Sequence, residues 1–358
     1  MTNGGSSRLP PEVAQTVLGP VLRQDLGFVL PHEHLIIDFG CRYRPGTEEN
    51  EVQLPFDPGD RWRLVAAPAA HRVNLLRLST ADAVYELQPF IAANGRTVVD
   101  LTTVGLGNDR GALAEVAKQS GVNLVGSTGV YVHRSHPDWV HTSSLDELAD
   151  RMVADLTPSE SGDPPAGVIG EIGVEEFEWC ELKVLEASAI AASRTGASVW
   201  LHVVSGALPE ARPPTIAAVE RYIAAGGDPY RLVLCHQDGS GNDPGYQDDL
   251  LARGVVLEYD TFGFQTGFTR DGAFVQLPSD TRRIREVADL WRRGRGDRIL
   301  LSHDLCYRMM TRQWGGWGLG HLPTTLRPRF TELGIDEDRW RTMTVDTPGR
   351  LLAGPPQP

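Results

Sequence analysis

Short apolar runs rich in β-branched residues recur along the chain, each followed by a polar loop and, in most cases, by a segment with helical periodicity. This alternation predicts βαβ units and a parallel sheet. The runs are apolar almost throughout, which fits a sheet buried on both faces. Eight runs are found, namely Gly27 to Ile37, Arg96 to Val104, Val122 to Val130, Gly167 to Val174, Ser198 to Val204, Arg231 to His236, Gly254 to Tyr259 and Arg298 to His303. Eight units favour a closed (β/α)8 TIM barrel, whereas an open doubly wound sheet requires one or two runs to be miscounted.

Three segments between the runs have clear helical periodicity: Trp179 to Thr195, Thr215 to Ala225 and Asp280 to Arg293. The segment Val17 to Leu22 precedes the first barrel strand and predicts a small β-hairpin over the barrel floor. Long loops without strong periodicity are expected after strands 1, 7 and 8. The first two cover Gly40 to Ala70 and Thr261 to Asp280, and the third contains a Gly/Trp-rich stretch from Trp314 to His321.

The length of 358 residues suits one such barrel with insertions, although length alone also permits two domains. We expect a flexible start over residues 1–16, a single TIM-barrel domain over residues 17–353 and a C-terminal tail over residues 354–358. The formal net charge of −13 argues against binding to nucleic acid or to an anionic membrane surface, because both require clustered cationic side chains.

Signals for export or membrane insertion are not evident in the sequence. The polar start is followed by no apolar run of signal-peptide length, and no stretch approaches the roughly 20 apolar residues that span a bilayer. The four cysteines, at positions 41, 180, 235 and 306, are scattered and have no CxxC spacing. Scattered thiols favour a reducing compartment, so we expect a cytoplasmic protein.

Metal-ligand residue types fall at the carboxyl ends of the predicted strands, where the active sites of TIM barrels lie. Strand 1 ends in His32, Glu33 and His34. Side chains alternate along a strand, so the two imidazoles point the same way and can grip one cation. An HxH pair alone is more often structural or incidental.

Metal-ligand residue types also occur on four other predicted strands. Glu171 lies within strand 4, His202 and His236 end strands 5 and 6, and Asp304 follows strand 8. Each strand is apolar until one ionisable group appears, and a buried charge requires a compensating partner. Any one of them could be a satisfied polar group of the core, but six at one end of a barrel predict a metal site.

In this order of ligands the chain resembles the amidohydrolase superfamily, and its wider motifs are similar to those of the phosphotriesterase-related branch. The resemblance extends from about Val17 to Leu352. The motifs are Gly27 to Leu35, Val99 to Thr103, Gly126 to Tyr131, Thr195-Gly196 and Val345 to Pro348.

One position departs from many members, which carry a carboxylated lysine on strand 4. Here Gly170 occupies the expected place of that lysine and Glu171 follows it. This resembles the phosphotriesterase homology proteins, in which a Glu bridges the metals, and it argues against phosphotriesterase activity itself. By this resemblance His32, His34 and Asp304 hold one divalent cation, His202 and His236 hold a second, and Glu171 and a hydroxide bridge them. Imidazoles and carboxylates suit Zn²⁺, with Mn²⁺ or Co²⁺ as substitutes.

The expected reaction is attack by the bridging hydroxide on the carbonyl of a carboxylic ester, lactone or amide. Asp304 is the candidate to accept the proton and pass it to the leaving group. Asp238 is either a proton relay or a loop cap. Three further residues are candidates for substrate binding, each with a structural alternative. Tyr131 either binds at the site or only packs its ring, and Arg308 is either an anion receptor or a surface residue. Trp317 belongs either to a lid or to a packed loop.

Two alternatives remain open at this point. The same metal pair can serve a phosphoester or phosphotriester hydrolase, and a binding protein can keep the metals as a structural staple. The presence of all six ligands, Asp304 included, counts against the second. The partner in either enzyme is a small-molecule substrate, and the resemblance implies a homodimer.

Overall fold

The strands of the barrel appear in the computed structural model close to where the apolar runs predict them. The structure describes residues 12–45, 51–75, 77–158, 162–270 and 273–353, so most of the predicted flexible start and all of the predicted tail lie outside the described residues. The barrel strands are β3 (Phe28–Glu33), β4 (Gly95–Asp100), β5 (Asn123–Val125), β6 (Ser127–Thr128), β7 (Val168–Val174), β8 (Val199–Val203), β9 (Leu232–Leu234), β10 (Val256–Tyr259) and β13 (Ile299–Leu301).

These strands pair in parallel in the order of the chain. β3, β4 and β5 form one ladder, and β6, β7, β8, β9, β10 and β13 form another. Only Gly126 separates β5 from β6, so the two act as one barrel strand. The last strand returns to the first, where the amide of Asp304 donates to the carbonyl oxygen of His32 at 3.2 Å. The predicted eight-stranded TIM barrel is therefore confirmed.

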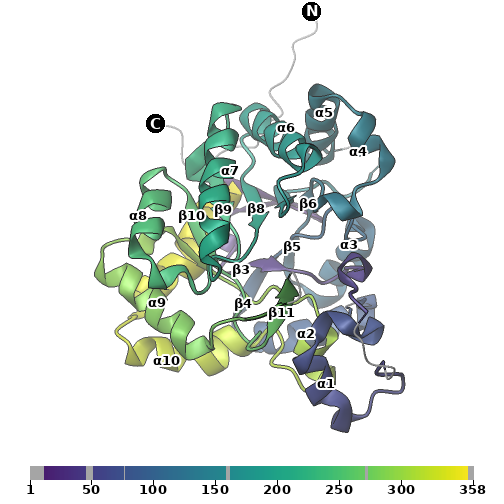
Figure 1. Ribbon diagram of the computed structural model, residues 1–358, viewed down its shortest axis with the longest axis vertical. Helices are drawn as coiled ribbons and strands as arrows, with labels where there is room; N and C mark the ends of the chain where they lie inside the picture. Colours follow the sequence, from purple (N-terminus) through teal and green to yellow (C-terminus); the bar gives the residue numbers. More distant parts are fainter. Residues whose placement is uncertain (1–11, 46–50, 76, 159–161, 271–272, 354–358) are drawn as a thin grey trace, which may run out of the picture.

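Helices surround the strands, as Figure 1 shows. Their ends follow local rules: the Ser144 hydroxyl and the Glu147 carboxylate form a capping box at the start of α5, and Gly196, with φ 78°, ends α6. The predicted helix from Trp179 to Thr195 coincides with α6. The helices are α1 (Arg61–Ala66), α2 (Thr80–Ala92), α3 (Arg110–Ser120), α4 (Asp138–Thr142), α5 (Leu145–Leu156), α6 (Trp179–Thr195), α7 (Arg212–Ala224), α8 (Pro244–Ala252), α9 (Asp280–Arg292), α10 (Arg327–Glu332), α11 (Glu337–Arg341) and α12 (Thr347–Ala353).

The N-terminal hairpin begins earlier than the sequence predicted. Strand β1 (Val13–Thr16) pairs antiparallel with β2 (Gly19–Leu22). Residues 13–16 are thus part of the hairpin and not of a flexible start, because the side chain of Ala14 and its neighbours are buried. The amide of Val17 donates to the carbonyl of Leu124 at 2.9 Å, which holds the hairpin beside β5.

The long loops after strands 1 and 7 contain more regular structure than their weak periodicity indicated. Helix α1 lies in the first, and the hairpin of β11 (Gly267–Arg270) and β12 (Ala273–Gln276) lies in the second. The two loops meet where the Thr266 hydroxyl donates to the carbonyl of Val65. Their order therefore comes from contacts between loops distant in sequence, which no local pattern records.

The barrel interior is apolar toward the amino ends of the strands and polar toward their carboxyl ends. Val29, Val99, Val168, Trp200 and Val256 belong to one buried cluster, closed from below by residues of the hairpin and of α12. Polar side chains begin at the carboxyl ends of the strands. None of the helices in the described ranges combines the length and the apolar character that crossing a bilayer would require.

Candidate metal centre

The carboxylate of Glu171 lies at the centre of the site, on β7, and four imidazoles surround it. Its Oε1 is 3.0 Å from His202 Nδ1 and 3.2 Å from His236 Nε2. The same oxygen is 3.3 Å from His32 Nε2, and Oε2 is 3.6 Å from His34 Nε2. One carboxylate facing imidazoles from three other strands is the arrangement that a bridging ligand requires.

Asp304 completes the group from the end of β13. Its Oδ1 is 3.2 Å from His34 Nε2 and 3.7 Å from His32 Nε2. Asp304 and His236 have positive φ angles of 49° and 59°. Such conformations are uncommon outside glycine, cost on the order of 1–3 kcal/mol and concentrate at functional sites. The backbone is strained where it turns these two side chains inward.

The structure brings together all six residues that the sequence predicted as ligands. Their chemistry fits divalent cations, because imidazole nitrogens and carboxylate oxygens are the donors that Zn²⁺ and similar ions take. A second observation agrees: Nε2 of His32 is buried and has no hydrogen-bond partner among the described residues. A buried polar atom without a partner is costly unless something occupies the space it faces.

Glycine at position 170 explains why Glu171 takes the central place. A Cβ atom on Gly170 would lie 2.5 Å from the carbonyl oxygen of Trp200, and the residue has φ 123°. No side chain fits there, so a lysine at this position is excluded. The predicted substitution of a glutamate for a carboxylated lysine therefore agrees with the backbone.

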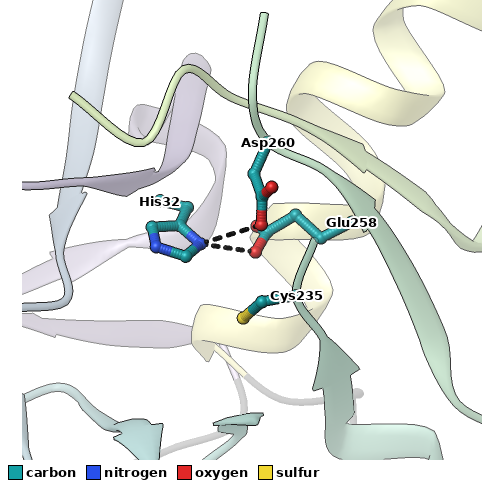
Figure 2. Close-up of side chains that lie close together, drawn as sticks. All are labelled: His32, Cys235, Glu258 and Asp260. Atoms are coloured by element: carbon teal, nitrogen blue, oxygen red, sulfur yellow. Dashed lines mark hydrogen bonds and ion pairs between the residues drawn. The ribbon is translucent and has the colours of Figure 1, made fainter. Parts of the chain in front are cut away.

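Carboxylates on β10 and just after it hold the ligands from behind. Glu258 Oε2 is 2.9 Å from His32 Nδ1, and Asp260 Oδ2 is 3.2 Å from the same nitrogen. Figure 2 shows both carboxylates pointing at the ring of His32, with Cys235 beside them. Asp260 Oδ1 also lies 3.0 Å from His236 Nδ1, so one carboxylate orients ligands of both predicted metals. Such partners fix the tautomer and direct Nε2 toward the metal.

Only one of these two carboxylates is firmly ionised. Burial raises the pKa of Glu258 to about 7, which the nearby His32 partly opposes. Burial also acts on Asp260, but His236 and His32 outweigh it and hold the pKa of that carboxyl far below its usual range. Burial raises the pKa of the Cys235 thiol well above its ordinary value, so the thiol is neutral. Asp260 is therefore the dominant electrostatic support.

Asp238 supports Asp260 and is held by a buried arginine. Its Oδ2 accepts the amide of Asp260 at 3.1 Å, and its Oδ1 lies 2.6 Å from Nε of the buried Arg283. Arg283 also pairs with Asp280 at 3.0 Å. Of the two roles considered, proton relay and loop cap, the structure favours a structural one, because a fully buried ion pair occupies the carboxylate.

Tyr131 lies at the site and contacts Arg42, a residue that the sequence analysis missed. The Tyr131 ring is 4.9 Å from the ring of His202, centre to centre. Its hydroxyl accepts hydrogen bonds from Arg42, and Arg42 Nη2 is 3.0 Å from His202 Nε2. Arg42 comes from the long loop after β3, where no periodicity or motif signalled it.

The other two predicted substrate-binding residues, Arg308 and Trp317, contact residues of the surrounding loops. The Arg308 guanidinium donates to the carbonyl of Arg77 at 3.1 Å and lies over the ring of Trp314, and its role as an anion receptor stays a prediction. Trp317 is 52% exposed and stacks on His321. It lines a cavity of about 190 Å³ together with Phe262, Phe264, Leu305 and Met309.

The comparisons with known proteins agree with this geometry. The model of the phosphotriesterase family matches residues 12–352. The chain belongs to the phosphotriesterase family. The N-acetyltaurine hydrolase of Salmo salar is 33% identical over 345 residues, which cover 94% of this chain and 97% of that protein. The expected family is thereby confirmed, and the chain is a hydrolase of the phosphotriesterase-like type.

Two solved structures are similar over nearly the whole chain. A resiniferatoxin-binding protein from Rhodobacter sphaeroides superposes with a TM-score of 0.89 at 32% identity, covering 97% of this chain and 96% of that one. A mutant phosphotriesterase-like lactonase from Deinococcus radiodurans gives 0.73 at 26% identity, with 95% and 99% covered. Family membership thus coincides with a shared fold along the entire barrel.

Proposed function

We propose that the protein is a binuclear metal-dependent hydrolase that cleaves the amide of a small N-acylated amine. The observation that carries this is the contact of one carboxylate, Glu171, with four imidazoles. His32, His34 and Asp304 would hold one cation, and His202 and His236 the other, with Zn²⁺ favoured over Mn²⁺ or Co²⁺. When bound, such a pair supplies a water whose pKa is lowered toward about 7.

The protein's own residues divide the remaining work. Glu171 has a side chain only 3% exposed and holds the centre of the site. Asp304 has a side chain 18% exposed, on the side that solvent reaches. Asp304 is therefore placed to accept the proton of the attacking water and to transfer it to the leaving nitrogen or oxygen.

The choice of bond rests on the relatives. Several curated relatives are named N-acetyltaurine hydrolase, which supports an amide, and a similar structure is a lactonase, which keeps esters and lactones within the same proposal. Phosphotriester hydrolysis is the second candidate, supported by the family itself. A purely binding role has support from the resiniferatoxin-binding neighbour, but the complete ligand set with Asp304 counts against it. A cytoplasmic location and a homodimer stay predictions.

A substrate panel with controlled metal content tests the proposal. The purified protein is loaded with Zn²⁺ or Mn²⁺, its metal content is measured, and N-acetyl amides, esters, lactones and a phosphotriester are assayed. We expect turnover of a carbonyl substrate that a chelator abolishes and added metal restores. Faster turnover of the phosphotriester would establish the second candidate. A fully loaded protein that cleaves nothing would establish the binding role.

A further inference from the structure

The solvent side of the metal centre carries a cation. Arg42 and Asp304 have side chains 15% and 18% exposed, whereas those of His32 and Glu171 are 0% and 3% exposed. Arg42 and Asp304 are therefore more accessible to solvent than these two buried ligands. The Arg42 guanidinium also lies 4.9 Å from the centre of the Tyr131 ring, which holds it in place at the rim.

Each N–H group of Arg42 has a hydrogen-bond acceptor in the structure. An arginine has five N–H groups and no acceptor. Nη1 donates to both carboxylate oxygens of Glu175, at 3.0 and 2.9 Å. Nε and Nη2 donate to the Tyr131 hydroxyl. The remaining N–H of Nη2 is directed at His202 Nε2, 3.0 Å away.

This last hydrogen bond is incompatible with a metal on His202. The Nδ1 atom of that ring faces the centre of the site, 3.0 Å from Glu171 Oε1 and 2.7 Å from His236 Nε2. A neutral imidazole that offers Nδ1 to a cation carries its hydrogen on Nε2. With a cation held at Nδ1, that nitrogen would donate and could not accept, so one N–H of Arg42 would lose its acceptor.

The carboxylate partner of Arg42 is shared with a second arginine, which also pairs with Glu176 at 3.0 Å. The shared carboxylate is that of Glu175, and Arg134 Nη2 lies 2.6 Å from Glu175 Oε2. A partly buried guanidinium with an unmatched N–H is satisfied best by an anionic oxygen, because charge-assisted hydrogen bonds are about twice as strong as neutral ones.

We propose that Arg42 binds an anionic group, a carboxylate or a sulfonate, on the substrate, and so selects acidic N-acyl amines. This inference rests on the proposed function, because it assumes that the bound anion belongs to a substrate. Binding of the anion itself does not require turnover. Arg42 would hold the acid group at the rim while the acyl carbonyl lies over the ligands.

The experiment compares two substrates on three proteins. The substrates are an N-acetylated ω-amino carboxylic acid and its neutral methyl amide. The proteins, all metal-loaded, are the wild type, Arg42→Gln and the matched control Arg134→Gln, which removes a neighbouring positive charge that contacts Glu175. We expect Arg42→Gln to lower kcat/KM for the acid by about 10- to 100-fold more than for the neutral substrate, the range for a lost charge-assisted hydrogen bond.

The outcomes are separable. Equal losses on both substrates, an equal loss in Arg134→Gln, or loss of metal from Arg42→Gln would each overturn the proposal. Should the wild type cleave neither substrate, hydrolysis of these two N-acyl amines is excluded, and calorimetric titration of the metal-loaded proteins with the acid decides about Arg42. Binding that weakens about 10-fold or more in Arg42→Gln alone supports the anion site. Absent binding, or binding equal in all three proteins, overturns it.

Discussion

The partners behind the metal ligands and those in front of them have opposite chemistry. Behind, in the barrel, Glu258 and Asp260 are fully buried acceptors that meet the Nδ1 atoms of His32 and His236. In front, at the rim, Arg42 is a donor that meets Nε2 of His202. The buried acceptors orient ligands for cations, whereas the partly exposed donor is the group that we propose to meet the substrate. The difference indicates that metal affinity and substrate choice are controlled from opposite sides of one site.

The largest effect is expected at Glu171, which stands between the two regions. Glu171→Gln removes the negative charge that four imidazoles share, so we expect loss of one or both metals and at least about a 10³-fold fall in turnover, as for other residues central to catalysis. Metal content by elemental analysis and kcat on the best substrate measure this. Two metals per chain with near-normal activity would remove the bridging role.

A smaller effect is expected from a substitution among the buried carboxylates behind the ligands. Asp260→Asn keeps the size of the side chain but removes the charge beside His32 and His236, so metal affinity should fall about 10- to 100-fold, as for other partners of metal-bound histidines. Glu258→Gln is the matched control and should lose less, since burial raises the pKa of Glu258 to about 7. Competition with a metal-binding dye gives both affinities. An equal loss in the two variants would contradict the assignment of Asp260 as the dominant support.

Counted per pH unit, the smallest of these effects is the dependence of metal binding on pH. Burial opposes protonation of His34, but Asp304 and Glu171 outweigh it and raise the pKa of the metal-free imidazole to about 9. A proton therefore occupies this ligand below pH 9 and must leave when metal binds. Metal affinity should weaken at least about tenfold for each unit that the pH falls from 8 to 6, since the proton on His34 is displaced and the pKa values of His32 and His236, which burial lowers, are also raised by neighbouring carboxylates. Titration calorimetry in two buffers measures the released protons, and an affinity independent of pH would contradict the expectation.

The sequence supported much of the fold and of the ligand set for one physical reason. A parallel strand buried on both faces must be apolar, so an ionisable residue at its end, such as Glu171 or His236, stands out. Glu258 and Asp260 give a weaker signal. They lie two residues apart, at the end of a strand and just after it, where acidic residues are also common on the surface. For Arg308 the sequence left two roles open, because four residues of spacing from Asp304 say nothing about the direction of an irregular loop.

What the sequence by itself determined is the order of the strands and the ends at which charged residues collect, because periodicity and apolar runs are local properties. The tertiary structure alone decided which groups stand behind those residues and which stand in front. Arg42 reaches His202 across 160 positions of the chain, and Asp238 pairs with Arg283 across 45. Such contacts depend on how the loops fold over the closed barrel, and the pattern along a single segment carries no trace of them.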